Sequence, residues 1–185
     1  MARTPSNMLP LGTTLPAATL PNVDGSSVSL EQQVGDKGLL VMFICNHCPF
    51  VIHIAPQLAS IVQQLKEKGI GVVAISSNDP VAYPADAPDK MGDFLAQYQL
   101  QFAYLFDESQ AVAKAFDAAC TPDFYLFDGD KKLVYRGQLD ESRPGNGVAV
   151  TGSDLLAAAA LVADGKAPAE DQKPSLGCNI KWRDA

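Results

Sequence analysis

The sequence lacks the features that define several classes of protein. Its 185 residues contain no run that resembles a transmembrane span, and only 19% of them are charged. The 47% hydrophobic content argues against a chain that is disordered throughout. Lys and Arg number 14 against 21 Asp and Glu, and the net charge of -7 disfavours a broad nucleic-acid-binding surface. We therefore expect neither a membrane nor a nucleic acid as a partner.

Cysteine is also scarce, at four residues. That number is too small for the disulfide framework of a small secreted scaffold. Four prolines interrupt the first 23 residues, which hold no continuous apolar stretch of the kind found in a signal peptide. We expect a cytoplasmic protein, in which cysteines are more often catalytic, metal-binding or inert than permanent crosslinks.

The length is typical of one domain with a substantial core, and we expect that domain to span residues 1–185. Prolines favour an extended amino-terminal segment over residues 1–24. A carboxyl-terminal tail is expected over residues 165–185, since it opens on the polar connector G-K-A-P-A-E-D-Q-K-P.

Hydrophobic patterning predicts strands that alternate with helices. Short apolar runs predict strands at 38–44, 70–76, 102–106, 124–127 and 133–135, and amphipathic patterns predict helices at 49–68, 89–98, 109–116 and 151–163. Asp128-Gly129-Asp130 suits a hairpin turn, and Thr151 with Asp154 suits a capping box at the last helix. We therefore expect an α/β fold with a central mixed sheet flanked by helices.

The chemistry concentrates in Cys45-Asn46-His47-Cys48, which stands where a buried strand leads into a helix. Spacing of i and i+3 brings two cysteines to one helix face, where a disulfide can close with little backbone movement. Pro49 suits the first turn of a helix, because proline lacks an N–H that would have no partner there.

This position predicts a role for each residue of the pair. The amino end of a helix favours an anion, so we expect a lowered pKa and the nucleophile at Cys45. We expect Cys48 to be the buried resolving cysteine, which attacks a mixed disulfide formed at Cys45. A protonated His47 would stabilise the thiolate further.

Two other interpretations of the pair are a zinc site and inert core cysteines. Zinc would need further ligands, for which His47 or His53 are the candidates. No second C-x-x-C or H-x-H cluster follows, and Cys120 and Cys178 are isolated in the sequence. We therefore expect no metal and no other cofactor.

The motifs C-N-H-C-P-F-V, T-P-D-F-Y-L-F-D and G-C-N-I-K-W together resemble the peroxiredoxin-related (AhpC/TSA, redoxin) branch of the thioredoxin-like superfamily, over about residues 15 to 183. The resemblance implies the thioredoxin-like fold and a thiol-disulfide oxidoreductase or isomerase. It also implies a cis-proline at Pro122 that faces the cysteine pair, with the backbone of Thr121 open to a partner peptide. Asn46 and Thr121 are accordingly the expected substrate-binding residues.

The sequence departs from the peroxiredoxin pattern P-x-x-x-T/S-x-x-C. Leu39 or Leu40 stands near the proline position and Met42 at the Thr/Ser position, so the hydroxyl that would orient a peroxide is missing. This lowers our expectation of antioxidant peroxidase activity with Cys45 as the peroxidatic residue, but keeps it as an alternative. A binding module without enzymatic activity is the third interpretation.

The remaining two cysteines have no assigned role. Cys120 suits an auxiliary thiol at the site or a small buried hydrophobic residue. Cys178 could meet Cys120 or a partner, or pack in the tail. The expected partners are protein or small-molecule disulfides, and the sequence leaves the oligomeric state open.

Overall fold

The computed structural model describes residues 3–183. The elements in chain order are β1 (Arg3–Pro5), β2 (Thr19–Pro21), β3 (Ser27–Ser29), η1 (Glu31–Gln33), β4 (Gly38–Phe43), α1 (Pro49–Glu67), β5 (Ile70–Ser76), η2 (Pro84–Asp86), α2 (Pro88–Tyr98), β6 (Ala103–Phe106), α3 (Ala111–Ala115), β7 (Cys120–Thr121), β8 (Asp123–Asp128), β9 (Leu133–Gly137), α4 (Ser153–Ala163) and β10 (Leu176–Asn179). Within this range, no helix has the length and apolar character needed to cross a membrane.

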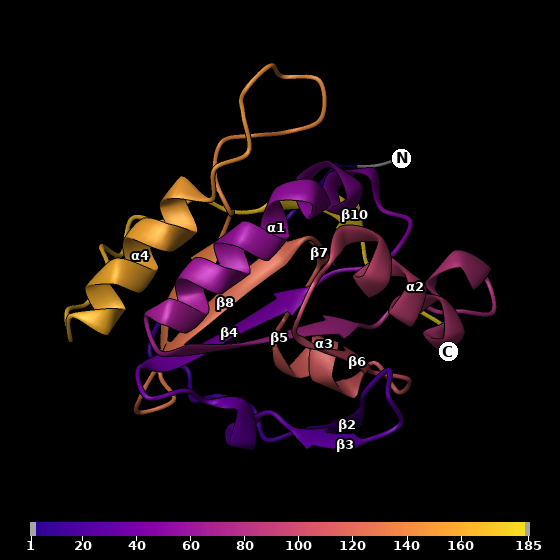
Figure 1. Cartoon of the computed structure of the whole chain (residues 1–185), viewed down its shortest axis with the longest axis horizontal. Helices are drawn as coiled ribbons and strands as arrows, with labels where there is room; N and C mark the ends of the chain where they lie inside the picture. The colour runs from indigo at the N-terminus through magenta and orange to yellow at the C-terminus, as the bar shows by residue number, and fades with distance from the viewer. Residues whose placement is uncertain (1–2, 184–185) are drawn as a thin grey trace.

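A five-stranded mixed sheet forms the centre, in the order β6-β5-β4-β8-β9. Figure 1 labels β6, β5, β4 and β8 of this sheet. Strand β4 pairs in parallel with β5 and antiparallel with β8, and β9 closes the antiparallel side. The parallel pairs are joined through α1 and α2, because parallel strands need a crossover connection. The predicted α/β fold with a central mixed sheet flanked by helices is confirmed.

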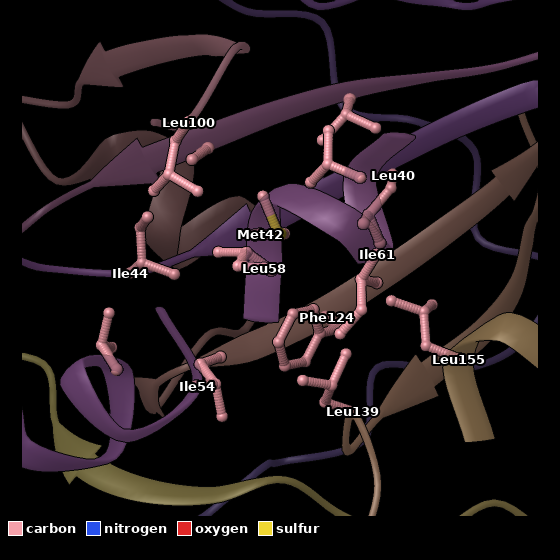
Figure 2. Close-up of a cluster of buried hydrophobic side chains, with 14 of the residues drawn as sticks. Leu40, Met42, Ile44, Ile54, Leu58, Ile61, Leu100, Phe124, Leu139 and Leu155 are labelled. Atoms are coloured by element: carbon pink, nitrogen blue, oxygen red, sulfur yellow. The ribbon is translucent and has the colours of Figure 1, made fainter. Parts of the chain in front are cut away.

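Strand β4 is buried on both faces, as its continuous apolar sequence predicts. Leu40 and Met42 pack with residues of α1, α2 and α4 in one core cluster, part of which Figure 2 shows. Leu39 and Val41 point to the other face, where they join residues of α3 and of the amino-terminal segment. The sheet therefore carries a hydrophobic core on each side, and its most central strand leads directly into the cysteine pair.

The two ends of the chain form a second sheet that the sequence did not predict. Strand β10 lies between β1 and β7, with both pairings antiparallel. Cys178 is opposite Arg3 on one side and opposite Thr121 on the other. The segment expected as a tail thus ends in a strand beside the residues that precede Pro122.

The predicted capping box at α4 is wrong. Gly152 occupies the N-cap in a left-handed conformation, with φ of 70°, and it has no side chain that could cap the helix. The Asp140 carboxylate instead accepts hydrogen bonds from the backbone N–H groups of Thr151 and Gly152 at 2.7 and 2.6 Å. Asp154 accepts a hydrogen bond from Gln138. Asp140 thus holds the two residues before the helix, while the backbone N–H groups of Ser153 and Leu155 donate to the Thr151 hydroxyl and the Leu139 carbonyl at 3.3 and 3.2 Å.

Docking of β10 on β7 requires glycine at position 177. A Cβ on Gly177 would lie 1.9 Å from the backbone oxygen of Thr121. We expect Gly177→Ala to lower the free energy of unfolding by about 1–3 kcal/mol, because the backbones must separate to accept the methyl group. Denaturation in urea measures this change.

Gly92→Ala is the matched control. Gly92 lies inside α2, and its Cβ would meet nothing within 4 Å. Alanine should leave stability unchanged or raise it by up to about 1 kcal/mol, because glycine is the poorer helix former. Equal effects at positions 177 and 92 would contradict the account of β10 docking.

Candidate active site

The cysteine pair lies at the carboxyl end of β4 and the amino end of α1. Cys45 and Cys48 are both buried, with exposed fractions of 1% and 0%. The helix begins at Pro49, so Cys48 is its N-cap and Cys45 lies in the connecting loop. The strand–C-x-x-C–helix arrangement that the sequence predicts is therefore present.

The surroundings of the two sulfurs favour a negative charge on Cys48 rather than on Cys45. A hydrogen bond from Cys45 to the Cys48 sulfur is the largest cause that lowers the pKa of Cys48, to about 5. Contacts with the thiol of Cys178 and the backbone N–H of Val51, in the first turn of α1, add to this effect. The surroundings of the pair therefore favour a thiolate on Cys48 over one on Cys45, and the protonated Cys48 thiol donates to the carbonyl of Thr121 at 3.2 Å.

The predicted lowering of the Cys45 pKa is wrong. Donation of its hydrogen to Cys48, burial, and the negative charge of Asp86 all raise the pKa of Cys45, in that order of size. The expectation assigned the effect of the helix end to Cys45, whereas the N-cap is Cys48 and the backbone N–H of Val51 lowers the pKa of Cys48 instead. Of the two thiols, Cys45 holds the hydrogen.

Asp86 of η2 holds the loop between the two cysteines, and sequence reasoning missed it. Its fully buried carboxylate accepts hydrogen bonds from the backbone N–H groups of Asn46 and His47 at 2.8 and 3.2 Å. It also accepts one from the side-chain amide of Asn78 at 2.8 Å. Asp86 is 40 positions from Asn46 in the sequence, within a proline-rich connector, so no local motif indicated it.

His47 is fixed by the same carboxylate. Its Nδ1 lies 2.6 Å from Asp86 Oδ2, and because a carboxylate accepts, Nδ1 carries the hydrogen. The imidazole stacks on Tyr83 with ring centroids 5.6 Å apart. Lys181 Nζ lies over the Tyr83 ring, at 5.5 Å from its centroid. The ring orientation of His47 is therefore set by η2 and its neighbours.

Asn46 has its side-chain groups engaged within the protein. Its amide donates to the backbone oxygen of Ala85 at 3.1 Å, and its Oδ1 accepts a hydrogen bond from the hydroxyl of Tyr104 at 3.0 Å. A partner that binds Asn46 must share or replace these bonds. The substrate-binding role of this residue stays a prediction.

The predicted cis bond between Thr121 and Pro122 is confirmed. Thr121 contacts both sulfurs of the pair, with its hydroxyl 3.5 Å from Cys45 Sγ and its carbonyl 3.2 Å from Cys48 Sγ. The expectation of an open Thr121 backbone is wrong, because β10 pairs with it. The chain itself occupies an edge that the resemblance assigned to a partner peptide.

The remaining cysteines differ in their relation to the pair. Cys178 Sγ lies 2.7 Å from Cys48 Sγ, so the structure brings it to the site. Cys120 is buried behind Thr121, and its thiol contacts the carbonyl of Pro122 at 3.8 Å. Burial raises the pKa of both thiols, that of Cys178 to about 12. Cys178 therefore contacts Cys48, whereas the sequence analysis gave Cys120 as its candidate partner.

Cys45, His47 and Asp86 form the one candidate metal-binding group found among residues 3–183, with their ligand atoms within 4.8 Å of one another. Two ligands of tetrahedral zinc lie about 3.3 Å apart, given bonds of about 2.0 Å. The His47–Asp86 hydrogen bond at 2.6 Å is shorter than that, and a metal would have to break it. The arrangement suits an orienting hydrogen bond better than a metal, and the absence of a metal stays a prediction.

A thiolate on Cys48 can be tested directly. We expect the ultraviolet absorbance of the reduced protein to report one thiolate that titrates with a midpoint of about 5, because Cys48 has that pKa. Cys48→Ser should remove this transition, whereas Cys120→Ser should keep it. A wild-type midpoint near the ordinary value of 9.0 would contradict the assignment.

Asp123, the residue after Pro122, is a buried carboxyl group behind the site. It accepts hydrogen bonds from the hydroxyls of Ser6 and Tyr125 at 2.7 and 2.9 Å. Burial raises the pKa of Asp123 to about 7, against these hydrogen bonds, which lower it. Because the group ionises more readily in the unfolded chain, its contribution to stability is complete below about pH 4 and is lost as the pH rises through 7.

The corresponding prediction concerns the variant Asp123→Asn. The free energy of unfolding of the wild type should fall, relative to that of the variant, as the pH rises from 4 to 7, by at most about 4 kcal/mol. Urea denaturation at several pH values measures this slope. Asp130→Asn, at an exposed position in the hairpin turn, should keep the wild-type slope. A slope that survives in Asp123→Asn would contradict the assignment.

Comparison with solved structures identifies two similar proteins of nearly the same length. A conserved protein from Geobacillus kaustophilus is 50% identical with a TM-score of 0.97, and the match covers 100% of this chain and 98% of the other. A hypothetical protein from Sinorhizobium meliloti 1021 is 46% identical with a TM-score of 0.95, and the match covers 98% of this chain and 100% of the other.

Curated relatives are more distant and have named activities. The thiol-disulfide oxidoreductase ResA of Halalkalibacterium halodurans is 24% identical over 66% of this chain and 66% of its own length, so the chain spans slightly less than two thirds of it. The peroxiredoxin Bcp of Escherichia coli K12 is 29% identical over 70% of this chain and 79% of its own length.

The Redoxin family model matches residues 10–155, which include β4, the cysteine pair, Thr121 and Pro122. Together with the strand–C-x-x-C–helix arrangement and the cis-proline, this match confirms the resemblance that the sequence motifs indicated. The chain is a thioredoxin-like protein and belongs to the Redoxin family.

Proposed function

We propose that this protein is a thiol-disulfide oxidoreductase in which Cys45 and Cys48 form a reversible disulfide. The observation that carries the proposal is the pair of buried cysteines where β4 leads into α1, with both sulfurs in contact with Thr121 before the cis-proline. A thiolate is the species that attacks disulfides, and a lowered pKa keeps it populated at neutral pH. Similarity to ResA supports the same reaction class.

Cys45 is the residue we propose to bond to the partner. The sulfur of Cys48 is enclosed by Thr121 on one side and Cys178 on another, at 3.2 and 2.7 Å. Cys45 lies in the loop before the helix, beside the half-buried Asn46 and His47. An approaching disulfide therefore meets Cys45 first.

The two thiols divide the proton steps between them. As Cys45 attacks a partner disulfide, its hydrogen passes to the Cys48 thiolate, with which it is already bonded. A Cys45–partner disulfide forms, and the other partner sulfur leaves as a thiolate. Cys48 returns its proton to that thiolate, since its own pKa is about 5, and then attacks Cys45. The Cys45–Cys48 disulfide forms and the reduced partner is released.

Asp86 and His47 act as positioning residues in this proposal. The buried carboxylate fixes the backbone of Asn46 and His47, so the loop presents Cys45 in one conformation. The same charge disfavours a thiolate on Cys45 and so keeps the negative charge on Cys48 until a partner arrives. Thr121, whose carbonyl contacts Cys48, supports the pair from the other side.

Thiol peroxidase activity is the second candidate. The Thr121 hydroxyl lies 3.5 Å from Cys45 Sγ and could orient a peroxide there, and the peroxiredoxin Bcp is a relative. Met42, at the position where peroxiredoxins carry the hydroxyl, is fully buried in the core and offers none. Disulfide exchange therefore has the stronger support.

Variants of the pair separate the two roles. Cys45→Ser should slow the reduction of insulin by dithiothreitol on the order of 100-fold, because the bond-forming residue is lost. Cys48→Ser should instead accumulate a mixed disulfide with oxidised glutathione on the tryptic peptide of residues 38–66, because attack proceeds and resolution does not. Mass spectrometry detects this adduct.

Cys120→Ser is the control and should retain wild-type exchange, since its sulfur is buried behind Thr121. Full exchange activity in Cys45→Ser would refute the role assigned to Cys45. A glutathione adduct on Cys120 or Cys178 in place of Cys45 would refute it as well. Oxidation of Cys45 by hydrogen peroxide that is faster than its exchange with insulin, and unaffected in Cys48→Ser, would favour the peroxidase instead.

A further inference from the structure

A third cysteine lies against the pair in the folded protein. Strand β10 pairs with β7 so that Cys178 is opposite Thr121, the residue before Pro122. This register places Cys178 Sγ 2.7 Å from Cys48 Sγ, with no room for an atom between them. Both side chains are buried, with exposed fractions of 1% and 0%.

Groups in and near the first turn of α1 partly offset the burial that raises the pKa of Cys178 to about 12. The backbone N–H of Val51 favours a thiolate on Cys48, and that of Phe50 favours one on Cys178. Lys181, three residues beyond Cys178, adds a positive charge that acts in the same direction. These groups therefore assist the ionisation of the Cys178 thiol that precedes its attack on Cys48.

We propose that Cys178 is a third redox-active cysteine, which exchanges with Cys45 as the disulfide partner of Cys48. The inference rests on the proposed function, since it begins from the Cys45–Cys48 disulfide. The Cys178 thiolate attacks Cys48 Sγ, so that the Cys48–Cys178 bond forms and the Cys45–Cys48 bond breaks. Cys45 leaves as a thiolate and takes up the proton that Cys178 gave up, so no external oxidant or reductant is needed.

This exchange changes the chemical form of Cys45, the cysteine that we propose a partner reaches first. The disulfide moves inward beneath β10, and Cys45 returns to the thiol form at the entrance of the site. The reduced partner, once released, can no longer attack a disulfide at Cys45. The reverse reaction, in which the partner is oxidised again, is therefore suppressed. Cys178 would in this way favour reduction of the partner over its oxidation.

The test uses the full chain with Cys45→Ser, so that the outcome is independent of any substrate. The reduced variant is treated with one equivalent of diamide, which takes two electrons and two protons from a pair of thiols, and is then alkylated and digested with trypsin. We expect the peptide of residues 38–66 to be linked to that of residues 167–181, in more than half of the molecules. The peptide of residues 115–131, which contains Cys120, should be fully alkylated.

Two further variants control this result. Adding Cys120→Ser to Cys45→Ser should keep the link, and adding Cys178→Ser should abolish it. If circular dichroism shows that Cys45→Ser is folded, but Cys48 and Cys178 are both still alkylated after diamide treatment, no link has formed and the inference is overturned. If Cys45→Ser does not fold, the same link is sought in the oxidised wild type, where its absence would count equally against the inference.

Failure of the inference is distinguishable from failure of the proposed function. Cys178→Ser should still form the Cys45–Cys48 disulfide within the peptide of residues 38–66. If that disulfide forms in Cys178→Ser, and neither Cys45→Ser nor the oxidised wild type shows a link to residues 167–181, only the role of Cys178 is wrong. If Cys178→Ser forms no disulfide at all, the proposed function fails as well.

Discussion

The arrangement of the site depends on how the amino end of α1 is satisfied. The first N–H groups of any helix lack partners within the helix, and they favour a negative charge. Here the N-cap is Cys48, whose thiolate lies at the helix end and accepts a hydrogen bond from Cys45. The acidity of one cysteine and the high pKa of the other both follow from that one interaction.

Residues distant in the sequence enclose this charge. The Asp86 carboxylate holds the backbone of Asn46 and His47, and β10 covers Thr121. Burial strengthens each of these interactions, because the interior screens charges less than water does. It also limits access, so the proposed reaction depends on Cys45 at the loop rather than on the more acidic Cys48. Acidity and proximity to the loop are thus divided between two buried residues three positions apart.

The sequence predicted the parts of the fold that local patterns determine. The run I-G-V-V-A-I-S matches β5 exactly in its bounds of 70–76, because a strand buried on both faces must be continuously apolar. The cysteine pair, its place before a helix and the cis-proline were also predicted, the last through family resemblance. These features carry their signal within a few consecutive residues.

Other features depend on contacts between distant segments and were missed for that reason. Asp86 is one acidic residue among many until the fold buries it against the loop of the pair. The strand β10 spans only residues 176–179, too few for a periodic pattern, and its partners lie at the opposite end of the chain and beside Pro122. The pKa of Cys45 was misjudged because the prediction assigned the effect of the helix end to the first cysteine, whereas the N-cap is the second.

The central claim is that the two cysteines at the start of α1 act as one two-electron redox unit. Its most direct test is the number and identity of thiols that alkylate after the protein is equilibrated in a series of dithiothreitol redox buffers and denatured. The account predicts a single two-electron transition in which two thiols are lost together, with Cys48 always one of them and Cys120 never. Loss of one thiol alone, loss that involves Cys120, or no transition in any buffer would contradict it.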